Sequence, residues 1–546
     1  MIQATIIALY LAAVLAVGAA ARRRSDSGHE GFFLAGRSLG PVLLLLTMAA
    51  TNFSAFTVFG FAGAGYRIGY GYYPIMAFGT GFMALSFLLL GVPIWRAGKR
   101  LGAITPPELV WLRFGNRPLR IAYLAVMVVF TLPYLAIQPM GAGYALQALL
   151  GIPYWLGATL TTAVVAGYVL LGGLRSEAWI DAFQGVLMLA AMTVVFLGVA
   201  GALGGFGAAN GAVRARFPEL FGRPGGTGEL TVMVWFSYMA LWFLCDPMFP
   251  QLFQRFLAAR DERSLRTAAL CYPLVTGVLF FMPVAIGVMG RLVVPGLEGP
   301  ATDRVLPLVV AKTLPAWAGA LAIAGGLAAL TSTMDSQLLT LASMFVRDAG
   351  AVLPGRGERH LRGKRVVVAV LALVGLALAL RPLGTILEIA TETFTGLAVL
   401  FPVTFAAVYW GRTNARAGLA SVLAGESLVV LYHFRLLPTF GFLPVVPVVA
   451  VSTLVLAAGS LIRPARGAEP LARVEARGAA WAAVFGLLFV LGVDFWQWDR
   501  SAPLWLGLPG WVWYYFGLTA LLFCAVGLYL FRSRGSAGPP ATGCRC

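Results

Sequence analysis

An almost unbroken series of polar residues lies within a long apolar stretch, Gly325–Asp348. Six of the seven positions 331–337 carry side-chain oxygens, and these six are Thr331, Ser332, Thr333, Asp335, Ser336 and Gln337. Such oxygens are ligands for hard cations and for polar solutes. Polar groups at membrane depth are costly, so they usually face a bundle interior or a cavity and mark an ion or substrate path.

The same hydroxyls have a structural alternative. Ser and Thr in membrane helices often bond back to their own helix carbonyls or join neighbouring helices. That explanation suits one or two hydroxyls. Six polar residues in seven positions, one of them a carboxylic acid, favour an ion or substrate path instead.

The composition indicates a membrane protein. The 546 residues are 60% hydrophobic and 11% charged, with a mean hydropathy of +0.84, whereas a soluble domain carries about 25% charged residues. The net charge of +18 could suggest nucleic acid. The basic residues, however, cluster in short loops between apolar runs, as the positive-inside rule expects. We therefore expect a small-molecule solute and the lipid bilayer as partners, and no nucleic acid. Five cysteines and three histidines give no readable zinc spacing.

The hydropathy pattern predicts about fifteen transmembrane helices, since about 20 residues cross a bilayer. The predicted spans are 2–21, 39–64, 71–95, 121–148, 153–172, 179–203, 230–252, 268–293, 315–346, 366–380, 384–410, 417–434, 440–462, 478–494 and 509–531.

Charge predicts the orientation of these spans. No charge precedes the first apolar run and Arg22–Arg24 follow it, which indicates an uncleaved helix with its N-terminus outside. Alternate loops are then cytoplasmic, and they hold 30 of the 40 Lys and Arg residues. This bias predicts a bacterial-type inner (plasma) membrane protein with a cytoplasmic C-terminus.

Two predicted spans are interrupted at matching places. The run Leu43–Tyr66 has the polar and β-branched centre Ala50–Ser54, followed by glycines. The run Trp242–Phe256 contains Pro247 and Pro250, which deny helix hydrogen bonds. The second run is the fifth span after the first, as in transporters whose inverted repeats each begin with a broken helix. We predict an all-α polytopic protein with an inverted-repeat core of five plus five helices and broken first helices.

Four stretches together resemble the sodium:solute symporter family. They are Phe32–Gly40 (FFLAGRSLG), Leu171–Gly185 (LGGLRSEAWIDAFQG), Gln254–Arg266 (QRFLAARDERSLR) and Leu330–Leu338 (LTSTMDSQL). They occur in family order, and the likeness spans about residues 30–460. It implies a carrier that couples a sodium ion to a small solute, with no organic cofactor and no enzymatic activity.

The resemblance also implies a sodium site between the first and eighth core helices. Its five ligands would be the hydroxyls of Ser332 and Thr333 and the carbonyls of Ala50, Phe53 and Ala329. A sixth residue, Asp181, matches an acidic residue near the inner exit of the ion. The chemistry agrees, because hydroxyls and freed carbonyls supply the oxygens that a dehydrated sodium ion requires.

Departures from the family pattern bear on the substrate. Where the sodium/proline branch has Asp, this chain has Asn52, as the sugar branch does. Trp242 and Cys245 replace the asparagine and tyrosine that contact sugar, and Phe56 and Thr57 replace a Glu-Gln pair. These departures argue against a sugar and leave Asn52, Thr57 and Trp242 as candidates for substrate binding or gating.

Acidic residues complete those candidates. Asp335 resembles branches that carry carboxylates and pantothenate, which favours a small organic acid or amino acid. Asp246 lies beside the prolines of the second interrupted run. Glu388 and Glu392, one helical turn apart, would bind a cationic substrate or a proton if buried, or form a wetted helix end; we favour the wetted end.

Arg255 is expected at the inner membrane surface as an interface arginine, with a gate role as the alternative. The expected organisation is an extra helix and loop at 1–38, the transporter core at 39–411, two peripheral helices at 412–462, a linker at 463–477, and a two-helix extension with a disordered tail at 478–546. Two rival functions stay open: a proton-coupled carrier using Asp335 or the glutamate pair, and a transporter-like receptor acting with a partner.

Overall fold

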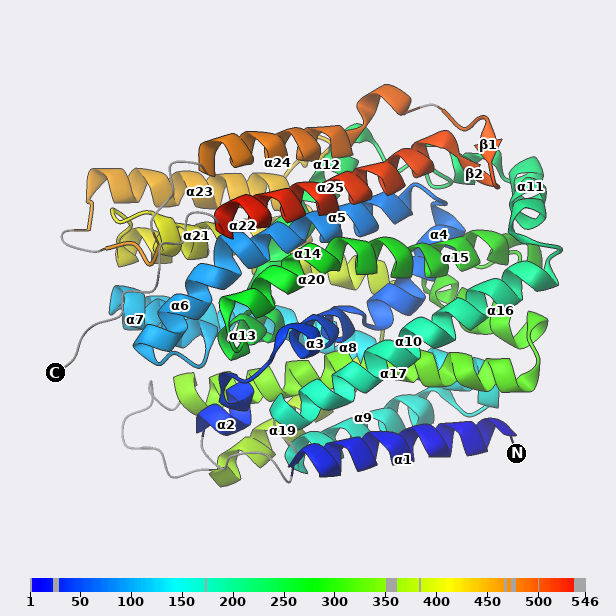
Figure 1. The fold of residues 1–546 in the computed structure, drawn as a ribbon, viewed down its shortest axis with the longest axis horizontal. Helices are drawn as coiled ribbons and strands as arrows, with labels where there is room; N and C mark the ends of the chain where they lie inside the picture. Colours follow the sequence, from blue (N-terminus) through cyan, green and yellow to red (C-terminus); the bar gives the residue numbers. More distant parts are fainter. Residues whose placement is uncertain are drawn as a thin grey trace.

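A computed structural model describes residues 2–22, 29–171, 174–349, 361–382, 384–465, 469–472, 478–498 and 500–534. In these residues the chain folds into a bundle of long helices lying roughly side by side (Figure 1). The single sheet among them is a two-stranded antiparallel hairpin, β1 (Leu504–Trp505) with β2 (Leu508–Pro509).

The helices before the second bend are α1 (Ile2–Arg22), α2 (His29–Leu34), α3 (Pro41–Asn52), α4 (Phe61–Arg67), α5 (Tyr72–Ser86), α6 (Val92–Leu101), α7 (Pro106–Phe114), α8 (Arg117–Leu150), α9 (Tyr154–Leu171), α10 (Leu174–Ala202), α11 (Phe206–Arg216) and α12 (Val232–Cys245). Those after it are α13 (Pro250–Ala258), α14 (Glu262–Leu279), α15 (Phe281–Val293), α16 (Val305–Thr313), α17 (Ala316–Met344), α19 (Leu361–Ala379), α20 (Ile386–Ala398), α21 (Phe401–Tyr409), α22 (Ala415–His433), α23 (Val445–Ile462), α24 (Gly478–Val493) and α25 (Gly510–Arg534).

Short 3-10 and π turns join several of these helices. They are η1 (Ala35–Arg37), η2 (Phe56–Gly60), η3 (Phe87–Gly91), η4 (Pro218–Phe221), η5 (Asp246–Met248), η6 (Gly299–Arg304), η7 (Phe345–Ala349) and η8 (Phe495–Gln497). Local sequence fixes several helix starts: the side chains of Thr105, Asn116 and Asn414 each accept a backbone N–H of the first turn.

Among the described residues, ten helices are long and apolar enough to cross a membrane, or up to twelve if each of two bent pairs is one span. Three shorter apolar helices, Thr5–Val17, Tyr154–Leu170 and Arg365–Ala379, coincide with the remaining predicted spans. The count of fifteen crossings and the inverted repeat stay predictions. The bent pairs are α3 with η2–α4 and α12–η5 with α13, the two runs predicted to break.

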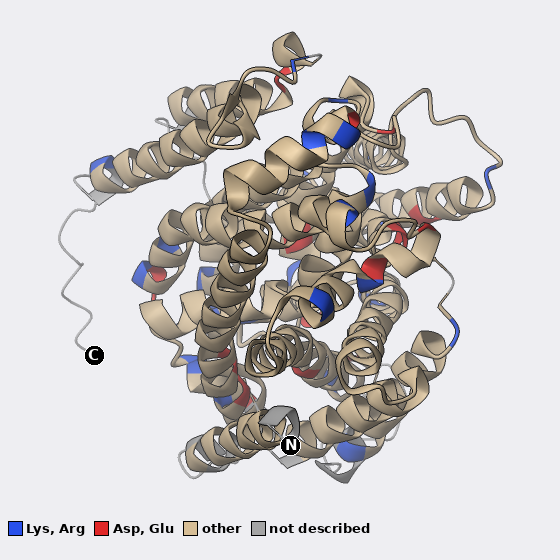
Figure 2. Cartoon of the chain, turned by 90° about the vertical axis from the view of Figure 1, so that its right-hand side faces the viewer, with Lys and Arg blue, Asp and Glu red and all other residues tan. Residues whose placement is uncertain are grey.

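Helices far apart in sequence surround the first bend. Helix α10 packs on α3 and on α17, and α14 packs on α3. A Cβ added to Gly325 in α17 would lie 2.4 Å from Ala191 Cβ in α10, so a residue without a side chain is required there. Figure 2 shows helices that are largely uncharged, with a few acidic and basic positions between them.

The extension packs against this bundle, with α25 against α14 and α5. Arg223, in the segment before α12, pairs with Asp494 at 3.1 Å, and both side chains are fully buried. The Arg223 guanidinium also lies within 5.0 Å of the ring centroids of Trp235, Trp498 and Trp511. The predicted linker and tail lie partly outside the described residues.

Candidate ion and solute site

The first bend interrupts an apolar run without a proline. Helix α3 bends by 59° against the helix that follows, and Phe53 leaves the helical conformation with φ −86° and ψ 93°. Side chains bind the N–H groups that the bend frees: Phe56 N donates to Ser54 Oγ at 3.1 Å, and Ala55 N donates to Gln138 Oε1 of α8 at 3.0 Å. The last carbonyls of α3 have no helical partner and are free to accept other donors.

Two hydroxyls of α17 point at those carbonyls. Ser332 Oγ donates to Ala50 O at 2.8 Å, and Thr333 Oγ1 donates to Thr51 O at 2.8 Å. Both hydroxyls also lie near Ala329 O, at 3.0 and 3.3 Å. The residues that supply these oxygens are all buried, and they are Ala50, Thr51, Ala329, Ser332 and Thr333. Neutral oxygens from two helices thus converge at one point, which is the donor set that a sodium ion requires.

Four of the five predicted sodium ligands are therefore brought together. The fifth, Phe53, lies at the bend itself, and its ring packs edge-on against Phe280 at 5.1 Å. Sequence reasoning missed Thr51, whose carbonyl accepts the Thr333 hydroxyl. Its position in the interrupted centre of the run was the available signal.

The second bend, of 54°, separates α12 and η5 from α13. Pro250 begins α13, and Pro247 lies within η5. The Asp246 carboxylate at this bend is only 2% exposed. It accepts a bond from the Cys245 thiol, with Sγ at 3.5 Å from Oδ1, and interacts with the side chain of Asn52.

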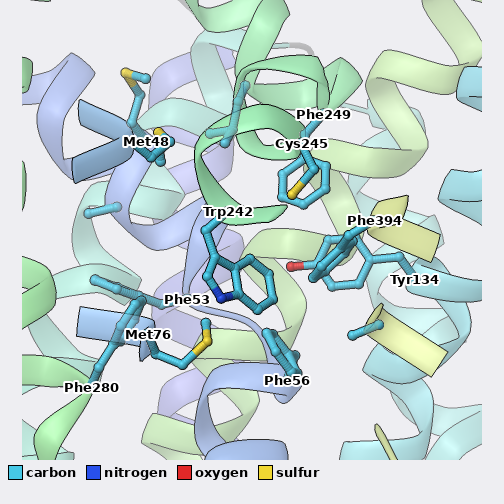
Figure 3. Close-up of a cluster of buried hydrophobic side chains, with 14 of the residues drawn as sticks. Met48, Phe53, Phe56, Met76, Tyr134, Trp242, Cys245, Phe249, Phe280 and Phe394 are labelled. Atoms are coloured by element: carbon cyan, nitrogen blue, oxygen red, sulfur yellow. The ribbon is translucent and has the colours of Figure 1, made fainter. Parts of the chain in front are cut away.

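A small cavity lies between the two bends. It is lined by Asn52, Phe56, Thr57, Phe61, Met76, Thr80, Tyr134, Trp242, Asp246, Phe249, Phe280 and Phe394. Figure 3 shows Trp242 in the middle of a cluster of buried side chains, beside Phe56 and Phe394. Four predicted substrate or gating candidates, Asn52, Thr57, Trp242 and Asp246, line this cavity together.

Aromatic rings are in contact around the cavity. The ring centroid of Trp242 lies 5.7 Å from that of Phe56 and 5.3 Å from that of Phe394. Phe394 in turn lies 4.9 Å from Tyr134 and 4.8 Å from Phe249. These separations are typical of favourable ring pairs, so the walls of the cavity form a packed aromatic set.

Asp181 of α10 adjoins the convergent oxygens through Thr51. The Thr51 hydroxyl lies 3.4 Å from Asp181 Oδ2 and 3.0 Å from Ser336 Oγ, while the carbonyl of Thr51 is one of the convergent oxygens. Thr47, one turn earlier in α3, donates to the same carboxylate oxygen at 2.5 Å. Asp181, the predicted exit residue, is thus linked to the convergent oxygens through a single residue, Thr51.

The expectation for Arg255 was wrong. Its side chain is fully buried, and its Nη2 bonds to Glu177 Oε1 at 2.9 Å, Asp181 Oδ2 at 2.8 Å and Ser336 Oγ at 2.7 Å. An interface arginine needs water at its head group. Arg255 instead neutralises two buried carboxylates, and its Nε also donates to Thr47.

Asp335 does not line the cavity. Its Oδ2 accepts a bond from the Tyr168 hydroxyl of α9 at 2.7 Å. Thr331 nearby faces α1 and α10, where its hydroxyl meets Tyr10 OH at 3.0 Å and Gln184 Nε2 at 2.8 Å. The polar series of α17 is therefore divided among different neighbouring helices.

Glu388 and Glu392 are both exposed. Glu388 completes a capping box at the start of α20, where its Oε2 accepts from Thr385 N at 2.7 Å. Glu392 lies 3.3 Å from His433, with exposed fractions of 67% and 56% for the two side chains. The structure therefore does not meet the burial condition of the paired-carboxyl hypothesis.

The fold and the site define a class before any relative is considered. A bundle of apolar helices with two broken helices around buried polar groups is the architecture of a secondary transporter. The family model of the sodium:solute symporter family matches residues 32–425, and the chain belongs to this family.

Curated relatives agree with that membership. The chain is 28% identical over 460 residues to the sodium/pantothenate symporter of Escherichia coli (strain K12), covering 83% of this chain and 94% of that protein. It is also 28% identical over 440 residues to the high-affinity proline transporter PutP of Bacillus subtilis (strain 168), covering 77% and 89%.

Solved structures share the fold. A substrate-bound, outward-open Na⁺-coupled sialic acid symporter superposes with a TM-score of 0.69 at 18% identity, covering 85% of this chain and 99% of that chain. A nucleobase-cation-symport-1 family transporter in a closed conformation gives a TM-score of 0.54 at 15% identity, covering 79% and 94%.

Family membership makes this chain a sodium-coupled transporter and not an enzyme, with sodium as the coupling ion and no organic cofactor. The bacterial relatives and the apolar helices make it a multi-pass inner-membrane protein.

Proposed function

We propose that this protein couples sodium entry to the symport of a small organic acid or amino acid by alternating access. One observation carries the proposal: the hydroxyls of Ser332 and Thr333 meet the carbonyls of the first bend, and Asn52 and Thr57 of the same bend line the cavity. Ion binding and solute binding would then order the same few residues, which is what coupling requires.

The ion ligands in this proposal are the hydroxyls of Ser332 and Thr333 and the carbonyls of Ala50, Phe53 and Ala329. In the described structure the two hydroxyls donate to α3 carbonyls. A bound sodium would receive the lone pairs of the same oxygens. Neutral ligands hold the ion modestly, so it can leave again. Inward movement of one charge supplies about 2.3 kcal/mol per 100 mV.

Asp181 is the proposed exit residue. Its Oδ2 lies next to the hydroxyl of Thr51, and Arg255 bonds to the same carboxylate oxygen. A carboxylate here would attract the ion out of the neutral site and toward the cytoplasm. Asp335 lies against Tyr168, outside the cavity, and we assign it no contact with the solute.

The solute would bind in the cavity between the bends, in contact with Asn52, Thr57, Trp242 and Asp246. The relatives are described as pantothenate and proline carriers, and both compounds are small organic acids or amino acids. The cavity is small in the described conformation, so it would have to widen to admit the solute, as alternating access allows.

The proposed orientation keeps the N-terminus outside and the C-terminus inside. The predicted outer segments α11 and the β1–β2 hairpin lie together at one end of the bundle, and α2, α6 and α7 lie at the other (Figure 1). The excess of Lys and Arg in the loops of the second end is the reason to propose that this end is cytoplasmic. Helix α25 runs from the first of these ends toward the second.

Sodium-dependent thermal stabilisation of the purified protein tests the ion site without a known solute, because a ligand that binds only the folded state raises stability. We expect a shift with sodium and none with potassium, and we expect Ser332→Ala/Thr333→Ala to abolish it. The matched control is Ser427→Ala/Thr453→Ala, which removes two hydroxyls of α22 and α23 that donate to carbonyls of their own helices. A folded wild type without any sodium shift would refute the proposal.

A further inference from the structure

The cavity between the bends combines one carboxylate with many aromatic rings. Seven of its twelve lining residues are aromatic: Phe56, Phe61, Tyr134, Trp242, Phe249, Phe280 and Phe394. Among the described residues that line the cavity, Asp246 is the single one with a formal charge, and none is a lysine or an arginine. The cavity therefore offers an anionic group and ring faces, and no cation for a solute carboxylate.

Asp246 has no ionic partner among the described residues, where none of the ion pairs includes it. Arg255, in the helix that follows, is already engaged by Glu177 and Asp181. The contacts of Asp246 are the Cys245 thiol and the Asn52 side chain, which are neutral. A carboxylate that is only 2% exposed is thus left without a counter-charge.

An unpaired charge at membrane depth is unfavourable and calls for a partner. A cation within about 6 Å of an aromatic face is attracted by the ring quadrupole, and aromatic cages are a recurrent way to bind ammonium groups. The Trp242 indole is central among the cavity rings and only 2% exposed (Figure 3). The Asp246 carboxylate and the aromatic rings thus both favour a cationic ligand group.

We infer that the transported solute carries a protonated amine or quaternary ammonium group, which binds between the Asp246 carboxylate and the aromatic rings of the cavity. This inference rests on the proposed function and narrows it: amino acids and betaines fit, and a plain carboxylate does not. Pantothenate, which has a carboxylate and no basic amine, is therefore not expected to be a substrate.

Isosteric compound pairs test the inference on the wild-type protein. We would measure thermal stabilisation of the full chain in saturating sodium by L-proline against cyclopentanecarboxylate, and by choline against 3,3-dimethyl-1-butanol. Each pair keeps shape and removes the cationic nitrogen. At least one nitrogen-bearing member should bind about tenfold or more tightly than its neutral-centred partner, since loss of a buried charge partner has effects of that size or larger.

The variant Asp246→Asn supplies the second arm. It should lose at least about tenfold in affinity for the compound that binds, while keeping the sodium shift, which also shows that the variant is folded. The control is Glu426→Gln in helix α22, which removes a half-buried carboxylate that does not line the cavity and should change neither shift.

Three outcomes would overturn the inference. One is equal or better binding of the partners without nitrogen; another is a sodium shift in which no nitrogen-bearing compound adds stability. The third is loss of the sodium shift in folded Asp246→Asn, which would make Asp246 an ion ligand. In all three the wild-type sodium shift is present, so the proposed function stands. Absence of that shift in the wild type would instead refute the proposed function.

Discussion

The two bends flank one cavity but carry different chemistry. The first bend offers neutral oxygens, namely carbonyls of Ala50 and Thr51 that meet the hydroxyls of Ser332 and Thr333. The second offers the Asp246 carboxylate beside a wall of rings. Neutral oxygens suit an ion that must dehydrate, bind and leave again, whereas a fixed charge suits selection among solutes.

The bends also differ in what causes them. Pro247 and Pro250 force the second bend locally, because proline lacks a helix donor. The first bend has no proline and is supported by Ser54 and, from another helix, Gln138. Local sequence thus encodes one bend, and tertiary packing completes the other.

The largest expected effect on stability comes from the residue that links the two bends. Arg255 follows the second bend and reaches the helix of the first through Thr47 and Asp181. Arg255→Gln should destabilise the protein by about 3–5 kcal/mol, because it leaves two buried carboxylates without their cation. The measurement is the thermal midpoint in detergent.

The control is Arg260→Gln, whose side chain is 57% exposed and whose pair with Asp261 lies at the surface. It should change the stability by about 1 kcal/mol or less. Equal midpoints for the two variants would contradict the buried network around Arg255.

Gln138→Leu tests whether the first bend depends on tertiary support. The change removes the acceptor of Ala55 N and should lower the stability by about 1–3 kcal/mol, the effect of an unpaired buried donor. Gln147→Leu, a half-buried position of the same helix, is the control, with an expected change of about 0.5 kcal/mol. If both variants match the wild type in thermal midpoint, the bend does not need α8.

A pair of substitutions should separate effects on sodium binding from effects on solute binding. Thr333→Val keeps the side-chain shape and removes one hydroxyl of the ion site, so it should weaken sodium about tenfold, or about 1.4 kcal/mol. Asp246→Asn should leave sodium affinity unchanged and alter solute preference. Sodium titrations of thermal stability, with and without solute, measure both. If both variants changed sodium affinity and solute preference in the same way, the two bends would not have separate roles in binding ion and solute.

The smallest effect is expected at the surface glutamates. Glu392→Gln removes a pair with His433 in which both side chains are mostly exposed, so the stability should change by about 1 kcal/mol or less. Sodium-driven uptake should be unchanged. Abolished uptake in Glu392→Gln or Glu388→Gln, with normal thermal midpoints, would restore the paired-carboxyl hypothesis.

The sequence predicted which helices meet at the first bend better than it predicted which neighbour each side chain contacts. It identified Ser332 and Thr333 through a resemblance, and the structure brings both to the first bend. It grouped Asp335 with them, yet Asp335 faces Tyr168. Seven consecutive helical residues point around the full circumference, since 3.6 residues complete a turn, so composition cannot say which neighbour each meets.

The buried position of Arg255 shows the same limit. In the sequence it follows an apolar run and precedes a polar loop, which is the pattern of an interface arginine. Its burial depends on Glu177 and Asp181, which lie more than 70 residues earlier in the chain and reach it only because α10 packs beside α3 and α17. Nothing local to Arg255 carries that information.

The sequence by itself determined the apolar runs, the proline-encoded bend and the polar series, because hydropathy and backbone chemistry act over a few residues. The tertiary structure decided which side of each helix faces the convergent oxygens, the cavity or another helix, because that rotation follows from packing between distant segments. Thr51, Gln138 and Arg255 acquired their places in this way, and Asp246 became the one charge in an aromatic cavity.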